Sequence, residues 1–137
     1  MTNLESEKNS VKAVINKFSK FWETGDMKIL SEIFSHDPEI VLYGTDAPEH
    51  WIGWEPFRQT VEQMIQVLED VRITIKEQHI FLHSSGDVAW FSQIWDWDFK
   101  AEGSHIHSEG QRLTGVLEKR SGNWVLVQIH NSVAVKN

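Results

Sequence analysis

The stretch 90–112 reads "WFSQIWDWDFKAEGSHIHSEGQR" and brings acidic and histidine side chains together within a short length of chain. Polar and aromatic residues alternate before the turn signal "AEGS", a pattern that predicts two β-strands joined by a tight turn. If the two residues "EG" form that turn, Asp98 lies opposite His107, and Asp96 lies opposite Glu109.

These pairs indicate two kinds of proton chemistry. Two carboxylates that share one site repel each other when both are ionised, which raises the pKa of one of them, so Asp96 beside Glu109 is a candidate general acid. Asp98 would orient the imidazole of His107 and favour its charged form. The same side chains, together with His105, are also acceptable metal ligands. A third interpretation is an ordinary solvent-exposed hairpin tip.

The other face of this hairpin is aromatic. Trp95, Trp97 and Phe99 follow one another on it, and such a row of rings needs burial. The protein's own core would bury them, and so would the sheet of a second subunit. The expected register puts Gly110 opposite Trp95, which leaves room for a ring.

Helices come first in the chain. Apolar residues at helical spacing predict a helix over residues 11–22, which Gly25 ends, and a short second helix that begins at the N-cap Asp26. Thr2 and Glu5 have the spacing of a capping box ahead of the first helix.

Strands dominate the rest of the chain. One strand is expected over 39–44 and a third helix over 53–70. Alternation with a period of two then predicts four strands separated by turn signals, over residues 71–83, 87–100, 105–120 and 123–135. Helices segregated from an antiparallel sheet define the α+β class.

Composition bounds the function. The 137 residues suit one domain over 1–137, and a formal charge of −7, carried by the first half of the chain, argues against nucleic-acid binding. The chain has no cysteine, which excludes disulfides and fits a reducing cytoplasm. The sequence predicts no signal peptide and no membrane span. We expect no cofactor.

Three further stretches resemble a known family: "WIGWEPFRQTV" (51–61), "GDVAWFSQ" (86–93) and "RLTGVLEKRSGNWVLVQIHNS" (112–132). With the order helix, helix, strand, helix and four strands, they resemble the SnoaL-like branch of the nuclear transport factor 2-like superfamily. The resemblance covers nearly the whole chain. The pieces that carry it are Arg112-x-Thr114, Gly122-x-Trp124 and His130-x-Ser132.

This resemblance implies a cone-shaped α+β barrel of cystatin-like fold, with three helices packed on a strongly curved, mostly antiparallel sheet, and a homodimer that pairs sheet against sheet. Relatives include ketosteroid isomerase, scytalone dehydratase, polyketide cyclases and the association domain of calcium/calmodulin-dependent kinase, so fold alone does not fix function. The association domain lines its pocket with arginines. Ser92, Gly115 and Asn131 occupy the matching positions here, which argues against an anion pocket of that type.

The same alignment implies that the acidic face of the hairpin is concave and that the aromatic face is a dimer surface. The cavity is then expected to be lined by Trp90, Ser92, Ile94, Asp96, Gln111, Leu113 and Asn131. On the helical side, the side chains expected to close it are Trp22, Tyr43, Trp51, Trp54 and Phe57, each of which is also an ordinary core residue. The loop 46–51 would lie at the rim, and the Tyr43 phenol is a candidate donor to an enolate oxygen.

The position of His130 depends on the last turn. If 121–122 is a two-residue turn, His130 faces Leu113 on the concave side. If Gly122 is a bulge, His130 meets Arg112 on the convex side, because a slip of one residue flips every side chain. Structural histidine and surface arginine remain the alternatives for these two residues.

Two classes of function follow. One is an enzyme that isomerises, dehydrates or cyclises a small apolar ligand, with proton exchange by Asp96 and by His107 or His130, and with Arg112 among the ligand contacts. The other is a non-catalytic, dimeric ligand-binding or assembly module.

Overall fold

The computed structural model describes residues 4–135. Helix α1, Leu4–Thr24, buries one stripe of apolar side chains that includes Val11, Ile15 and Phe18. It ends at Gly25, whose φ of 69° is left-handed. Thr2 lies outside the described residues, and so does the capping box predicted there.

Helix α2, Met27–Ile33, begins where the sequence predicts it. The Asp26 carboxylate accepts a hydrogen bond from the backbone N–H of Lys28 at 3.0 Å. Strands β1, Val41–Tyr43, and β2, His50–Ile52, form a short hairpin, and helix α3, Trp54–Val67, follows. Strand β2 lies in a segment that was expected to be partly loop.

Four long strands complete the chain: β3, Glu69–Leu82; β4, Val88–Ala101; β5, Ser104–Arg120; and β6, Asn123–Ser132. They form an antiparallel meander, as predicted, and β1 adds to it in parallel beside β6. The sheet order is β2-β1-β6-β5-β4-β3.

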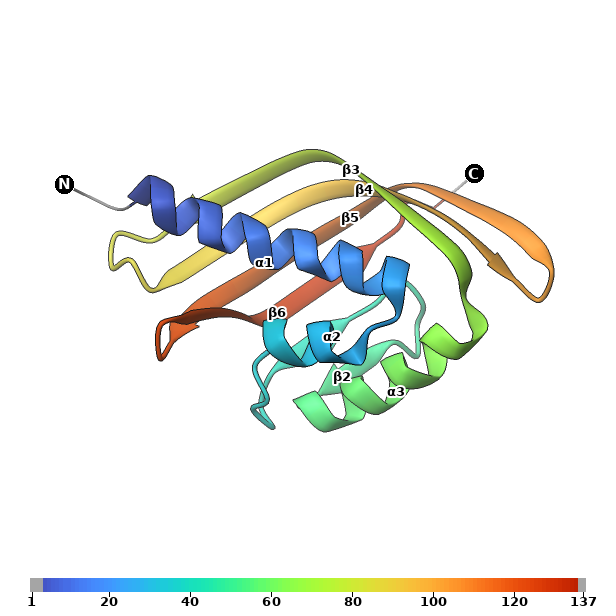
Figure 1. Ribbon diagram of the computed structural model, residues 1–137, viewed down its shortest axis with the longest axis horizontal. Helices are drawn as coiled ribbons and strands as arrows, with labels where there is room; N and C mark the ends of the chain where they lie inside the picture. Colours follow the sequence, from blue (N-terminus) through green and yellow to red (C-terminus); the bar gives the residue numbers. More distant parts are fainter. Residues whose placement is uncertain (1–3, 136–137) are drawn as a thin grey trace.

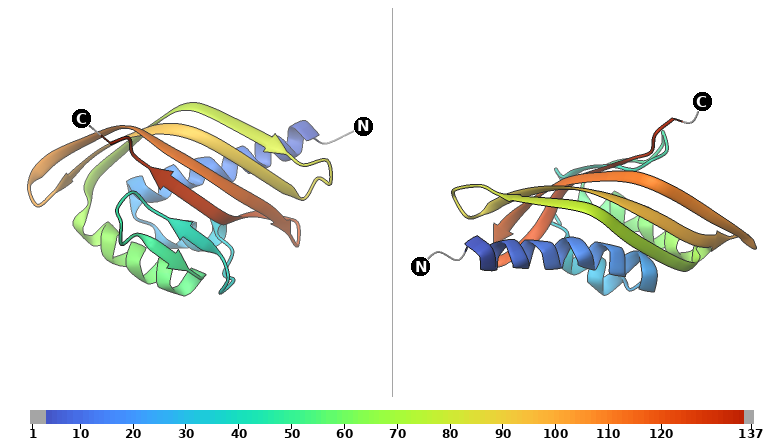
Figure 2. Two further views of the ribbon diagram at one scale, coloured as in Figure 1. Left: turned by 180° about the vertical axis from the view of Figure 1, so that it is seen from behind. Right: turned by 90° about the horizontal axis from the view of Figure 1, so that it is seen from above.

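All three helices lie on one side of this sheet, which bends around them (Figure 1). The view from above shows that the opposite side carries none of the described helices (Figure 2). We call these the helix-covered face and the open face. The α+β prediction is confirmed, with a sheet that is strongly curved but not closed into a barrel.

A bulge in the β4–β5 hairpin decides which side chains reach which face. Near the turn the pairing is as predicted, with Asp98 opposite His107. Beyond it the register shifts by one residue, so that Trp95 lies opposite Gln111. The shift occurs at Gly110, whose φ is 72°, a left-handed value that glycine adopts without strain. Trp95 therefore shares a face with Gln111 and not with Gly110.

The aromatic row belongs to the helix-covered face. Trp95 and Trp97 are 1% and 8% exposed. Trp95 packs on Phe18 of α1 with ring centres 5.8 Å apart, and Trp97 packs on Trp22 at 5.2 Å. The protein's own core buries these rings, and the prediction that they form a dimer surface is wrong.

A second bulge displaces His130. Ser121 and Gly122 both have left-handed φ, and they form the two-residue turn that was one of the two alternatives. A register shift between Val116 and Leu117 then adds one residue, so His130 lies opposite Thr114 on the open face. Neither alternative anticipated this second bulge.

Candidate ligand cavity and the carboxylate–histidine cluster

A cavity of about 250 Å³ lies between the helices and the helix-covered face of the sheet. Its wall draws on α1, α3, strands β1 and β2 with the loop between them, and strands β4 to β6. It comprises Phe18, Trp22, Tyr43, Gly44, Thr45, Asp46, Glu49, Trp51, Phe57, Val61, Met64, Leu68, Trp95, Trp97, Phe99, Gln111, Leu113, Ile129 and Asn131. Seven residues that the sequence analysis expected to line or close the cavity are among them: Trp22, Tyr43, Trp51, Phe57, Gln111, Leu113 and Asn131. Their contact with a ligand stays a prediction.

Aromatic rings make up much of this wall. Trp51 meets Phe57 edge to face with ring centres 5.2 Å apart, and its indole N–H donates to the Thr60 hydroxyl at 3.0 Å. Trp22 and Trp97 meet in the same way from α1 and β4. Such contacts hold the rings in fixed orientations and give the cavity a stiff apolar surface.

The polar part of the wall is a chain of amides. Trp95 Nε1 donates to Asn131 Oδ1 at 3.0 Å, Asn131 Nδ2 donates to Gln111 Oε1 at 2.7 Å, and Gln111 Nε2 donates to Ser108 Oγ at 2.9 Å. Because an indole N–H can only donate, it fixes the orientation of Asn131, which in turn fixes that of Gln111. Each amide nitrogen keeps one further N–H.

The rim of the cavity lies on the β1–β2 loop. Glu49 Oε1 accepts hydrogen bonds from the backbone N–H of Asp46 at 3.0 Å and from the Thr45 hydroxyl at 3.4 Å. Asp46 is exposed and Glu49 is half-buried, and they are the only carboxylates in the wall of this cavity among residues 4–135. The position of this loop at the rim agrees with the expectation from the sequence, which did not include these two side chains.

Several residues predicted to line the cavity do not reach it. Trp90, Ser92, Ile94 and Asp96 belong to the open face, because the bulge at Gly110 reverses the expected orientation of β4 relative to β5. Trp90 is 42% exposed there, where its ring stacks on Phe81 with centres 6.0 Å apart. Trp54 is buried between the rings of Phe34 and His36, outside the cavity wall.

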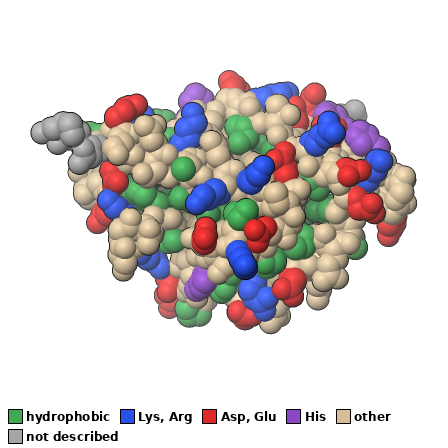
Figure 3. All heavy atoms as spheres, in the orientation of Figure 1, with side chains coloured by type: hydrophobic (Ala, Val, Ile, Leu, Met, Phe, Trp, Pro, Cys, Tyr) green, Lys and Arg blue, Asp and Glu red, His purple; other side chains and the backbone are tan. Residues whose placement is uncertain are grey.

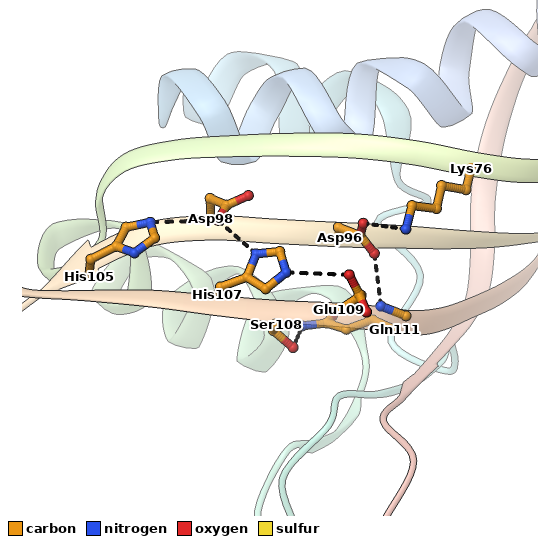
Figure 4. Close-up of polar contacts among 9 residues, drawn as sticks. Lys76, Asp96, Asp98, His105, His107, Ser108, Glu109 and Gln111 are labelled. Carbon is orange, nitrogen blue, oxygen red and sulfur yellow. Dashed lines mark hydrogen bonds and ion pairs between the residues drawn. The ribbon is translucent and has the colours of Figure 1, made fainter.

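Asp96 is an ion-pair partner and not a proton donor with a raised pKa. Its carboxylate contacts Lys76 Nζ at 2.6 Å and accepts from the Gly110 backbone N–H at 2.8 Å (Figure 4). The hydrogen bond from Lys76, followed by that from Gly110, lowers the pKa of Asp96 below its ordinary value. The prediction of a carboxyl pair with Glu109 fails because the bulge places Gly110 beside Asp96.

His107 has the predicted partner. Its Nδ1 lies 2.7 Å from Asp98 Oδ1, and this hydrogen bond raises the pKa of His107. Glu109 lies 3.7 Å from the other ring nitrogen, and His105 lies 3.5 Å from Asp98. Figure 3 shows histidine, acidic and basic side chains gathered over the end of the molecule that the β4–β5 hairpin forms. We call Asp98, His105, His107 and Glu109 the hairpin cluster.

The hairpin cluster is exposed and lies outside the cavity wall. Within residues 4–135 no group of three or more His, Asp or Glu side chains has an arrangement that holds a metal ion. These features match the solvent-exposed tip among the three interpretations of this hairpin.

His130 and Arg112 lie on the open face. The ring of Tyr43 stacks on His50 with centres 4.8 Å apart and lies 5.1 Å from the ring of His130. Arg112 is exposed, and its Nε donates to the Ser132 hydroxyl at 3.1 Å. Tyr43 thus borders the cavity while its ring packs with histidines.

Helices on one face of a curved sheet, with an apolar cavity between the layers, define a class of α+β pocket proteins. The chain belongs to one family of that class, the SnoaL-like domain family, which matches residues 11–136.

Solved structures share the fold. A nuclear transport factor 2-like (NTF2-like) superfamily protein from Salmonella enterica serovar Typhimurium superposes with a TM-score of 0.85 at 17% identity, over 97% of this chain and 94% of that one. A protein from Streptomyces avermitilis, described as a "putative dehydratase from the NTF2-like family", gives 0.84 at 14% identity, over 96% and 99%. A "putative ketosteroid isomerase" from Shewanella frigidimarina gives 0.67 at 20% identity, over 88% and 92%.

These likenesses establish the NTF2-like, cystatin-like fold and leave the activity open. No curated protein matches the sequence. None of the described helices is long and apolar enough to cross a membrane.

Proposed function

We propose that this protein binds a small, mostly apolar molecule in the cavity between its helices and its sheet. The observation that carries the proposal is the stiff aromatic wall closed on one side by the oriented amides of Asn131 and Gln111. Binding sites for small molecules commonly combine an apolar surface with a few placed polar groups. The ligand is smaller than a typical drug, because drug-sized sites measure roughly 300–1,000 Å³.

The test is a titration with 2-ethylnaphthalene followed by tryptophan fluorescence. Met64 lies in the cavity wall, so Met64→Trp fills the cavity and is expected to abolish saturable binding. Met27→Trp makes the same exchange at a half-buried position outside the wall and should leave binding intact. Equal binding by both variants, or no binding of 2-ethylnaphthalene, 2-acetylnaphthalene or 2-naphthoate by the unaltered protein, would refute the proposal.

A second candidate is proton transfer on the bound ligand, as in an isomerase or dehydratase. The carboxylates of Asp46 and Glu49 at the cavity rim favour it, and the names of two structural neighbours support it. Hydrogen–deuterium exchange at the α-carbon of a bound ketone is the assay. Exchange that is lost in Asp46→Asn, with binding retained, supports this function, and exchange no faster than in buffer excludes it.

We also propose a homodimer, formed through the open face of the sheet. Phe81 and Trp90 are 49% and 42% exposed and stack on each other there. They border a groove of about 420 Å³ that also includes Gly115, Gln128 and His130. Large exposed apolar patches are typical of interaction surfaces. A cytoplasmic location remains our expectation from the cysteine-free sequence.

A further inference from the structure

We propose that the ligand is a neutral molecule with a hydrogen-bond-accepting oxygen, a carbonyl above all, and that the indole N–H groups of Trp22 and Trp97 bind this oxygen. This inference rests on the proposed function, because it specifies the ligand of the same cavity.

Both indole nitrogens are buried without an acceptor. Among the described residues, the buried side-chain polar atoms that lack a partner are Ser19 Oγ, Trp22 Nε1, Gln93 Nε2, Trp97 Nε1 and Trp124 Nε1. Trp22 and Trp97 are each 8% exposed. Leaving a buried donor unpaired destabilises the folded state, so each such group calls for an explanation.

The two unpaired indoles are neighbours in the cavity wall. Trp22 comes from α1 and Trp97 from β4, and their ring centres lie 5.2 Å apart. Ser19, Gln93 and Trp124 do not belong to this wall. The edge-to-face contact of Trp22 and Trp97 offers at most a weak N–H···π interaction, which is a poor substitute for an oxygen acceptor. An oxygen bound against this pair of rings would offer an acceptor to the unpaired donors.

The rest of the wall also favours an acceptor. Asn131 Nδ2 and Gln111 Nε2 each use one N–H within the amide chain and keep a second. The wall therefore holds several donors without an acceptor, namely the two indole N–H groups and one N–H of each amide, and a hydrocarbon would leave these unpaired.

The charges of the cavity wall favour a carbonyl ligand over a carboxylate ligand. No Lys, Arg or His side chain is present in the cavity wall that the described residues form, and the rim carries the carboxylates of Asp46 and Glu49. A carboxylate ligand would lose its hydration without gaining a cation and would be repelled at the rim. A ketone, ester or lactone offers the acceptor without that cost.

The experiment compares three probes of one shape: 2-acetylnaphthalene, 2-ethylnaphthalene and 2-naphthoate. Binding is measured by titration of the indole N–H signals in ¹H–¹⁵N spectra, in which Trp22→Phe and Trp97→Phe identify the two signals. The ketone is expected to bind about three- to tenfold more tightly than the hydrocarbon, as for one or two neutral hydrogen bonds, and to move both signals downfield. The naphthoate should bind more weakly than either.

Single-residue variants test whether the two indole N–H groups cause the preference for the ketone over the hydrocarbon. Trp22→Phe and Trp97→Phe keep a ring but remove the donor, so each should reduce the ratio of ketone to hydrocarbon affinity. Trp124→Phe is the matched control, because it removes an equally buried, unpaired indole N–H outside this cavity. The ratio should not change in that variant.

Failure of this inference and failure of the proposed function give different results. Hydrocarbon binding as tight as ketone binding, or tighter binding of the naphthoate, overturns the inference and leaves a ligand-binding cavity. If none of the three probes binds, the proposed function fails with it. The comparison of probes on the unaltered protein decides the question even if one variant does not fold.

Discussion

The carboxylate of Asp96 accepts a hydrogen bond from the backbone N–H of Gly110 at 2.8 Å, at the point where β5 gains one residue over β4. This contact stabilises the bulge, which decides which side chains of β4 and β5 share the open face and which share the cavity. Before the bulge, Asp98 and His107 share the open face. Beyond it, Trp95 and Gln111 share the cavity.

Replacing Asp96 tests the role of this contact. Asp96→Asn weakens the charge-assisted bond with Lys76, which is half exposed, and should lower the free energy of unfolding by about 1–2 kcal/mol at pH 7. Because the folded state lowers the pKa of Asp96, its contribution is present above the ordinary pKa of about 4 and is lost as pH falls through the lower folded value.

Urea denaturation between pH 3 and pH 7 measures this difference. The exposed carboxylate of Asp70, 3.6 Å from Lys100, provides the control, and Asp70→Asn should change stability by much less. A difference between the Asp96 variant and the unaltered protein that stays constant down to the lowest pH would contradict the assignment.

His107 titrates as a partner of Asp98. The hydrogen bond to Asp98 raises the pKa of His107, so Asp98→Asn should lower that pKa, as read from the imidazole signals in an NMR titration. The contribution of this pair to stability is complete below the ordinary histidine pKa of about 6.5 and is lost as pH rises through the folded value. Glu102→Gln removes another carboxylate of the same hairpin and should leave His107 unchanged. An equal response to both variants would argue against the pair.

The amide chain should be costly to interrupt. Asn131→Leu leaves the Trp95 N–H and the Gln111 carbonyl without their partners, which is expected to lower the free energy of unfolding by about 1–3 kcal/mol. Asn123→Leu, at an exposed position of the same strand, is the comparison. Similar stability of the two variants in chemical denaturation would show that the hydrogen-bonded amides of Asn131 and Gln111 do not order the cavity.

The open face should determine the oligomeric state. Trp90→Glu places a charge in the exposed ring stack with Phe81 and should convert a dimer to a monomer in sedimentation velocity. Ile106→Glu makes the same kind of change on an exposed residue at the hairpin tip and should not. A monomer in the unaltered protein would remove the basis for this interface.

The sequence was sufficient for the fold because its periodicities and turn residues agree with one another. Gly25 and Asp26 separate two helices as expected, and the four-strand meander begins and ends within a few residues of its predicted bounds. The family resemblance points to the same architecture.

The faces of the sheet were harder to predict, because a bulge changes register without changing the alternation that a sequence displays. The signal at Gly110 was present, since glycine inside a strand often marks a bulge. It was interpreted instead as space for a ring. Because the bulge adds one residue to β5, Trp95 and Trp97 lie in the core and not at the expected interface, and Asp96 lies outside the cavity.

Intermolecular nuclear Overhauser effects from bound 2-acetylnaphthalene to assigned methyl groups show directly whether the ligand lies in the cavity. Val61 and Leu113 lie in the cavity wall, whereas Val116 lies in the groove of the open face. A ligand in the cavity gives contacts to the methyl groups of Val61 and Leu113 and none to Val116. Contacts to Val116 alone would place the ligand on the open face and would exclude binding in the cavity.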